Sequence, residues 1–256
     1  MSQIEKAEQF AALHCKDAPL VLYNIWDAGG ARTLAKAGAA AIATGSWSMA
    51  AAHGFKDGEA IPLELVLMLV RQICASVDVP VTVDFEGGYA TQPDQVAENV
   101  RQVIHAGAIG INFEDRVVAG DGLYSIQNQV DRIAAIRRAA NEEGVPLFIN
   151  ARTDLFLGTD PETHKDRMPE AKDRAAAYSE AGASGFFVPG LTETSLLSDV
   201  AAATDLPVNA MMLGELTSLH SVRDCGISRF SYGPAPFVHA AEDLEARFKA
   251  VMKTDA

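Results

Sequence analysis

One pattern recurs along the chain and constrains its fold more than any other feature. A short, β-branched apolar run is followed by a polar cluster and then by a longer segment with helical spacing, and this unit occurs eight times. The apolar runs are nearly continuous rather than alternating, which is typical of parallel strands covered on both faces. We therefore expect strands at Leu20–Ile25, Ala39–Ala43, Val79–Val83, Ala108–Phe113, Val145–Ile149, Gly185–Val188, Leu206–Ala210 and Ile227–Ser231.

The segments between these runs have the spacing of amphipathic helices. The clearest apolar stripe repeats at steps of three and four residues and consists of Leu63, Val66, Leu67, Val70 and Ile73. The tripeptide Ala-Gly-Ala recurs at 37–39, 106–108 and 181–183, each time where a helix has to end before the next strand. Glycine at such a position takes the left-handed conformation that commonly ends a helix.

Eight alternations of strand and helix without a linker predict an α/β fold, a single (β/α)8 TIM barrel over residues 1–256. A short helix at Ser2–His14 is expected before the first strand. The alternative is a doubly wound open sheet. Such a sheet usually has fewer strands, and Asp27–Arg32, after the first strand, lacks the spacing of a dinucleotide-binding glycine motif. The pattern therefore favours the barrel.

Charge and cysteine content narrow the choice of partners and compartment. The chain carries 34 Asp and Glu against 21 Lys and Arg, a formal net charge of −13, so nucleic acid and anionic membranes are disfavoured as partners. Cys15, Cys74 and Cys225 are too few and too scattered for a disulfide framework, and we expect buried free thiols. The first residues lack the apolar core of a signal peptide, and no apolar run is long enough to span a bilayer. A cytoplasmic protein is expected.

Active sites of such barrels form at the carboxyl ends of the strands, where this sequence is strongly acidic. Asp84 and Glu86 lie two apart at the end of the third strand, so both are expected to project to the same face, and Glu114 ends the next strand. Converging carboxylates need a proton or a cation, and Mg²⁺ suits one or two direct carboxylates with water. The alternative is that Asp84 caps the following helix while Glu86 is solvated.

Two further strand-end residues have both a functional and a structural interpretation. Arg152 directly follows an apolar strand and is suited to hold a substrate carboxylate or an enolate oxygen, or else to form an ion pair with Asp154 or Glu114. Asp57 lies on a glycine-rich loop that is able to close over the site, but Asp-Gly is also ordinary turn chemistry.

Four segments together resemble the isocitrate lyase / phosphoenolpyruvate mutase superfamily. They occur in the order and with the spacing of that family, from about Val21 to Ser231, and they are residues 44–57 (TGSWSMAAAHGFKD), 83–89 (VDFEGGY), 113–115 (FED) and 150–154 (NARTD). The resemblance implies a small 2-oxo or 2-hydroxy carboxylate bound beside Mg²⁺, with Mn²⁺ as an alternative ion. It also implies a C–C or P–C bond that breaks through an enolate-like oxyanion.

The resemblance also assigns roles to individual residues. Asp84 would be the principal metal ligand, with Glu86 and Glu114 reaching the ion through water, and Arg152 would bind the carboxylate and the oxo oxygen. The substrate site would be completed by Gly45, Ser46 and Trp47, with Trp47 helping to exclude water. Asn209, at the end of the seventh strand, is a further candidate substrate-binding residue. Asp57 would belong to the gating segment.

The sequence also departs from the family pattern. The lyases carry a Lys-Lys-Cys-Gly-His loop after the fourth strand and the mutases use a Lys and an Asn there, whereas residues 116–124 hold no Cys, His, Lys or Asn. Tyr124 is the candidate acid in this stretch. Glu86 stands where mutase-like members have Asp, and Gly45-Ser46 inverts the usual Ser-Gly order. The metal and oxo-acid core is therefore retained without the specialised lid.

The sequence thus predicts an Mg²⁺-dependent C–C lyase, similar to an oxaloacetate decarboxylase or a methylisocitrate lyase. The alternatives are a phosphonopyruvate hydrolase or phosphoenolpyruvate mutase activity, or a non-catalytic binder of Mg²⁺ and an oxo acid. The resemblance further implies a homo-oligomer, either a dimer or a tetramer. Its substrate is expected to be a small 2-oxo or 2-hydroxy carboxylate.

Overall fold

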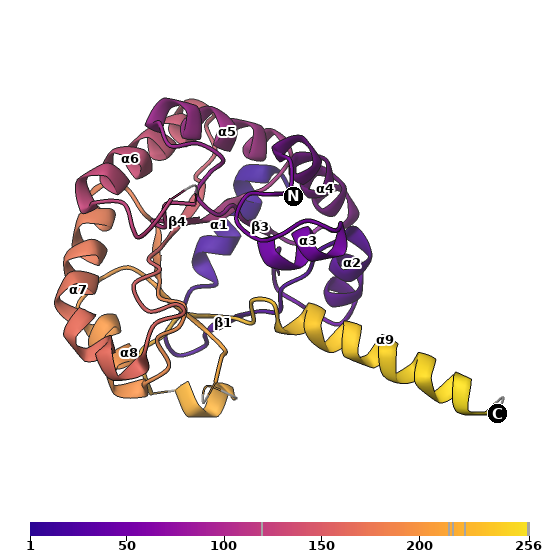
Figure 1. Ribbon diagram of the computed structural model, residues 1–256. Helices are drawn as coiled ribbons and strands as arrows, with labels where there is room; N and C mark the ends of the chain where they lie inside the picture. The colour runs from indigo at the N-terminus through magenta and orange to yellow at the C-terminus, as the bar shows by residue number, and fades with distance from the viewer. Residues whose placement is uncertain (119, 215, 217, 223, 255–256) are drawn as a thin grey trace.

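The computed structural model describes residues 1–118, 120–214, 216, 218–222 and 224–254. Ala119 of the 116–124 segment and the last two residues of the expected domain lie outside this description. Within the described residues, eight parallel strands form one sheet surrounded by helices (Figure 1). The strands are β1 Leu20–Leu22, β2 Ile42–Ala43, β3 Val81–Asp84, β4 Gly110–Glu114, β5 Phe148–Arg152, β6 Gly185–Phe187, β7 Val208–Met211 and β8 Arg229–Ser231.

The sheet has the strand order of a barrel rather than of an open doubly wound sheet. From β2 to β8 each strand pairs with the next in sequence, and β1 pairs with β8 in parallel register, Val21 opposite Phe230. A parallel bridge between Ile25 and Thr44 connects the ends of β1 and β2. The (β/α)8 prediction is confirmed. All eight expected runs contain a strand or overlap one, although several strands begin two or three residues later than predicted.

The helices alternate with the strands as the spacing predicts. Between and around the strands lie α1 Gln3–Ala12, α2 Ala28–Lys36, α3 Ser46–Ala52, α4 Leu63–Ser76, α5 Pro93–His105, α6 Ile126–Glu142, α7 His164–Glu180, α8 Thr194–Ala202 and α9 Ala235–Thr254, with short 3-10 turns η1 Pro161–Thr163 and η2 Leu219–Val222. The expected N-terminal helix is therefore present as α1. Gly38, Gly107 and Gly182 have φ of 95°, 102° and 100°, so each takes the left-handed conformation expected after α2, α5 and α7.

The barrel interior holds buried polar side chains, among which Arg229 of β8 and Asn150 of β5 both donate to the Asn112 side-chain oxygen at 2.9 Å, and its amino-terminal end is closed by α1. Phe10 is fully buried and packs edge-on against Phe148 of β5, with ring centroids 5.3 Å apart, and the His14 ring stacks on the same phenylalanine. Because this end is plugged, the open cavities at the carboxyl ends of the strands are the place where a ligand has access.

Helix α9 projects away from the barrel (Figure 1). Its apolar residues Leu244 and Phe248 are 71% and 64% exposed. No helix in the described part of the chain is long and apolar enough to cross a membrane. The three cysteines are free, as expected, but the prediction that all are buried was wrong, because Cys15 follows α1 at the surface and Cys74 is only partly covered.

Candidate active site

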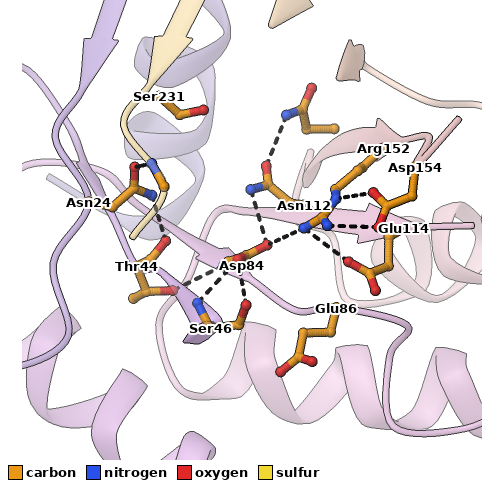
Figure 2. Close-up of polar contacts among 12 residues, drawn as sticks. Asn24, Thr44, Ser46, Asp84, Glu86, Asn112, Glu114, Arg152, Asp154 and Ser231 are labelled. Carbon is orange, nitrogen blue, oxygen red and sulfur yellow. Dashed lines mark hydrogen bonds and ion pairs between the residues drawn. The ribbon is translucent and has the colours of Figure 1, made fainter. Parts of the chain in front are cut away.

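Asp84 is the centre of a hydrogen-bond network at the carboxyl end of β3 (Figure 2). Its Oδ2 accepts hydrogen bonds from the backbone N–H of Ser46 at 3.1 Å and from the Ser46 hydroxyl at 2.7 Å. Its Oδ1 accepts from the side-chain amide of Asn112 at 3.3 Å and lies 3.9 Å from an Arg152 nitrogen. Asp84 therefore does not cap the next helix, and its carboxylate faces the interior of the barrel mouth.

Arg152 ends β5 and is surrounded by carboxylates (Figure 2). Its Nε and Nη2 donate to the two oxygens of Asp154 at 2.6 and 2.9 Å, and its Nη1 lies 3.0 Å from Glu114. The ion pairs that the sequence left as an alternative are thus present in the ligand-free protein. They also hold the guanidinium at the floor of a cavity.

The negative charge around Arg152 exceeds the positive charge. Glu114 is 4% exposed, and its pKa is raised well above the ordinary value by burial, with repulsion from Asp154 and Asp84 only partly offset by Arg152. Without a further cation, the repulsion among these carboxylates is reduced when one of them takes up a proton. The cluster is therefore short of positive charge and lies against open space.

Glu86 also lies near Arg152 and Asp84, but not through the strand geometry that the sequence predicted. Strand β3 ends at Asp84, so the expectation that Asp84 and Glu86 project from one strand face was wrong. Glu86 instead has a left-handed φ of 49° in the turn that follows, and its Oε2 accepts a hydrogen bond from the backbone N–H of Glu59 at 2.7 Å. Burial, followed by repulsion from Asp84, raises its pKa to about 8, so the alternative of a solvated Glu86 is also wrong.

Glu59 connects the Asp57 loop to the turn after β3. Its carboxylate accepts from the backbone N–H of Tyr89 at 2.7 Å while its own N–H donates to Glu86. Asp57, two residues earlier, lines both cavities described below, and its pKa is raised by desolvation and by repulsion from Asp84. The loop that carries Asp57 is thereby fixed at the mouth of the barrel.

Two cavities meet at this mouth. The larger, of about 380 Å³, has polar groups at its floor, including Asn24, Ser46, Asp84, Asn112 and Arg152, and apolar residues along one wall. The smaller, of about 140 Å³, is lined by carboxylates and arginines, namely Asp57, Glu86, Glu114, Arg116 and Arg152, together with smaller groups. Arg152 and Asp57 border both.

The donor set of the smaller cavity fits a hard divalent cation that keeps part of its water shell. Carboxylate oxygens are the ligands that Mg²⁺ prefers, and this ion needs only one or two of them directly. Among the described residues no three acidic, His or Cys side chains stand close enough to form a complete cage. Asp84 lines the larger cavity rather than the smaller one, and each of these acids has a protein partner: Asp84 has Ser46, Glu86 has Glu59 and Glu114 has Arg152.

The remaining expected site residues are not all at the cavities. Ser46, Gly45 and Trp47 line the larger one, but the Gly45 N–H already donates to the Ile25 carbonyl at 3.0 Å, and Trp47 is 38% exposed at the rim. Neither cavity is lined by Asn209, which is fully buried beneath the floor on β7.

Tyr124 is also absent from the residues that line the two cavities. The Arg132 guanidinium lies over its ring, 4.2 Å from the ring centroid. The structure therefore does not bring Tyr124 to the place where a bond would break.

Several residues that shape the floor received no role from the sequence. Asn24 donates to the Thr44 carbonyl at 2.9 Å and accepts from the N–H groups of Tyr232 and Gly233, each at 2.9 Å, so it joins the ends of β1, β2 and β8. Asn112 orients Asp84. Their position at strand ends was visible in the sequence, but a neutral amide carries no signal that separates this role from ordinary capping.

Comparison with known proteins agrees with this geometry. The model of the phosphoenolpyruvate phosphomutase family matches residues 10–252. The 2-methylisocitrate lyase of Escherichia coli (strain K12) is 31% identical over 219 residues, which cover 82% of this chain and 71% of that protein.

Solved structures show the same fold. The crystal structure of a candidate phosphonomutase from Burkholderia cenocepacia J2315 is 45% identical, with a TM-score of 0.94, and the match covers 97% of this chain and 99% of that chain. A phosphonopyruvate hydrolase solved in complex with oxalate and Mg²⁺ is 18% identical, with a TM-score of 0.87 and coverage of 100% and 89%, and supports the fold alone.

The resemblance drawn from the four sequence segments is therefore confirmed. Members of the superfamily include lyases, mutases and hydrolases, which use a divalent metal ion and act on small carboxylates. The chain belongs to the phosphoenolpyruvate phosphomutase family, within the isocitrate lyase / phosphoenolpyruvate mutase superfamily of enzymes.

Proposed function

We propose that this protein is an Mg²⁺-dependent lyase that cleaves a C–C bond of a small 2-oxo or 2-hydroxy carboxylate through an enolate-like intermediate. The observation that carries the proposal is the position of Arg152, a cation among three carboxylates at the floor of a 380 Å³ cavity. A fixed guanidinium in a desolvated site is suited to stabilise an oxyanion that forms during the reaction.

Arg152 has the main role in substrate binding. Its planar fork matches a carboxylate or a carboxylate next to an oxo group, and the substrate would take over contacts that Glu114 and Asp154 now make. The Ser46 hydroxyl, 2.7 Å from Asp84, lies at the same floor and is placed to orient a polar group of the substrate. Trp47 at the rim would limit the entry of water.

Asp84 would hold the metal ion directly, with Glu86 and Glu114 as ligands through water. Mn²⁺ is an alternative to Mg²⁺. When bound, the ion supplies Lewis acidity that polarises the oxo group and lowers the energy of the enolate. Burial, together with repulsion from Asp84, raises the pKa of Glu86 and of Glu114, which is consistent with a site built for a cation.

For a 2-oxo acid with a carboxylate on C3, the bond between C3 and that carboxylate breaks and the carboxylate leaves as CO2. The electron pair of the broken bond becomes the C2–C3 double bond of the enolate, whose oxygen would face Arg152. The enolate carbon then takes a proton to complete the product. We assign Asp57 as the group that moves this proton, because its carboxyl lines both cavities and its pKa is raised. Tyr124, the candidate acid within the 116–124 segment, is not carried forward because it faces Arg132.

Two other functions have some support. A phosphonopyruvate hydrolase or phosphoenolpyruvate mutase activity is supported by the names of the matching family and of the 45% identical solved neighbour. A non-catalytic binder of Mg²⁺ and an oxo acid is supported by the segment 116–124, which has no Cys, His or Lys.

We also propose that the protein is a homo-oligomer of the cytoplasm. Tyr23 beside β1 is 41% exposed, and α9 carries apolar residues that are open to solvent, so two apolar surfaces are available for a second copy. The three free cysteines suit a reducing compartment.

An NMR time course with Mg²⁺ and a panel of 2-oxo acids, 2-hydroxy acids and phosphonopyruvate tests the function. The Asp84→Ala variant is run in parallel to subtract spontaneous, metal-driven decarboxylation. Consumption of one C–C substrate by the wild type alone supports the lyase, and release of phosphate from phosphonopyruvate supports the hydrolase. If oxalate binds with Mg²⁺ and no compound is consumed, the protein is a binder for the panel tested.

A further inference from the structure

The larger cavity has two chemically different ends. Its floor carries Arg152 and the polar groups around Asp84, as described above. Its outer wall is formed by apolar side chains from the ends of β6 and β7, the loops that follow them and the first turn of α9, namely Phe187, Pro189, Met211, Met212, Leu213 and Val238. A bound ligand would meet both ends if it extends beyond its carboxylate.

The apolar wall begins directly at the polar floor. The Arg152 guanidinium lies 5.9 Å from the centre of the Phe187 ring, and Phe187 is 4% exposed. A substrate whose carboxylate contacts Arg152 therefore has its remaining chain against Phe187 and the methionines.

Few basic side chains line this cavity in the part of the chain that the structure describes. Of the described residues that line the larger cavity, Arg152 at the floor and His239 are the basic ones. His239 lies on α9, where it is exposed to solvent. A second carboxylate on the outer part of the substrate would thus lose water without gaining a cationic partner, in a protein of net charge −13.

We propose that the substituent that extends from the reacting carbon atoms along this wall is apolar and uncharged, so that the protein acts on 2-oxo or 2-hydroxy acids that carry an alkyl group there. The carboxylate or carbinol carbon that takes part in C–C cleavage counts among the reacting atoms. This inference rests on the proposed function, since it takes Arg152 as the anchor of the carboxylate. Met211 and Met212 are unbranched and polarisable, which suits linear and branched alkyl groups alike.

The test is calorimetric binding at saturating Mg²⁺. Oxalate reports the floor alone. Pyruvate, 2-oxobutanoate, 2-oxopentanoate and 2-oxohexanoate lengthen the chain by one methylene each, and we expect affinity to rise about threefold to fourfold per methylene. The pair 2-oxo-5-methylhexanoate and 2-oxoglutarate has nearly one shape but differs in charge, and we expect the uncharged member to bind at least about tenfold more tightly.

Variants of the wall provide the matched controls. Met211→Lys places a cation in the wall and is expected to reduce or invert the preference within the isosteric pair, whereas Met211→Leu keeps it. Leu213→Lys makes the same test at a side chain that is 46% exposed, where the fold is not at risk. Oxalate affinity should stay within about twofold in Met211→Leu, and in the two lysine variants the preference within the isosteric pair is read as a ratio, so that a general gain of anion affinity is divided out.

The outcomes separate this inference from the function on which it rests. If the wild type binds oxalate but binds 2-oxoglutarate as tightly as 2-oxo-5-methylhexanoate, or gains nothing from added methylenes, the apolar-chain inference is overturned and the floor stands. If oxalate does not bind with Mg²⁺, the proposed function is overturned, and this inference with it.

Discussion

The barrel contains two buried clusters of arginine and carboxylate that start from adjacent residues but differ in what surrounds them. Glu114 belongs to the Arg152 cluster, which borders two cavities. Asp115, the next residue, belongs to a second cluster, in which it accepts hydrogen bonds from Arg174 at 3.0 Å and from the Tyr178 hydroxyl at 2.9 Å. Neither cavity is lined by a residue of this second cluster.

The difference lies in charge balance and access. Arg174 faces one fully buried carboxylate, Asp115, and one half-exposed carboxylate, Glu170, so the second cluster is closely paired. Asp115 also accepts a hydrogen bond from the Asp154 backbone N–H at 3.0 Å. This bond helps to position the Asp154 carboxylate, which accepts from Arg152. A paired, enclosed cluster holds the fold, whereas an unbalanced cluster beside a cavity is suited to bind an ion and a ligand.

Replacing each arginine by methionine should separate the two roles most strongly. We expect Arg152→Met to lower oxalate affinity in the presence of Mg²⁺ by about 100-fold or more. Arg174→Met should instead lower the free energy of unfolding by about 3–5 kcal/mol, because it leaves Asp115 buried without its partner. Calorimetry of binding and of unfolding measures both. Equal losses of affinity in the two variants would contradict the distinction.

Removing one acid from each cluster should change the free energy of unfolding by clearly different amounts. Asp115→Asn is expected to cost about 3 kcal/mol of unfolding free energy. Glu114→Gln should change it by less than about 1 kcal/mol or raise it, because the amide oxygen keeps an acceptor for Arg152 and one of three crowded carboxylates is removed, whereas both oxygens of Asp115 accept hydrogen bonds. Urea unfolding of the metal-free proteins checks the pair. A larger loss for Glu114→Gln than for Asp115→Asn would show that the first cluster is structural too.

The pH dependence of stability should reflect the crowded acids. The pKa of Glu86 in the folded, metal-free protein is about 8, above its ordinary value of 4.5. The folded state therefore binds more protons than the unfolded state between these values, and this group's contribution, complete below pH 4.5, is lost as pH rises through 8, at up to about 1.4 kcal/mol per pH unit. Glu86→Gln should flatten this slope when unfolding is followed in EDTA from pH 5 to 9. An unchanged slope would argue against a protonated Glu86.

The smallest effect is expected at Tyr124. Its carbonyl accepts from Arg174 at 3.1 Å and its ring lies against Arg132, so it belongs with the enclosed cluster rather than with the cavities. Tyr124→Phe keeps both contacts and should change oxalate affinity and turnover by less than about twofold. A loss of turnover with unchanged oxalate affinity would restore Tyr124 as an acid.

The fold was predictable because hydrophobic periodicity reports it directly. Parallel strands that are covered on both faces need continuous apolar runs, and the barrel places their polar ends together, so Asp84, Glu114 and Arg152 were expected at one mouth and are found there. The turn at Glu86 was not predictable, because its left-handed φ of 49° is imposed by tertiary contacts with Glu59 and not by a glycine.

The parts of the site that the sequence did not predict also depend on tertiary contacts. The apolar wall combines Phe187 and Met211 with loop residues and with Val238 of α9, which are far apart along the chain and carry no motif. The adjacent residues Glu114 and Asp115 look alike in sequence, yet Glu114 at the end of β4 contacts Arg152, whereas Asp115, which follows the strand, contacts Arg174. The roles of such residues depend on packing, which spacing does not specify.

The most direct test of the account is the coupling between Mg²⁺ and oxalate. A charge-deficient cluster should bind each ligand more tightly when the other is present, and by the same factor, because coupling free energies are reciprocal. Titration calorimetry of wild type and Asp84→Asn, with and without the second ligand, measures this factor. We predict at least about a tenfold coupling in the wild type and its loss in Asp84→Asn. Oxalate binding of equal strength in EDTA and in Mg²⁺ would contradict the account.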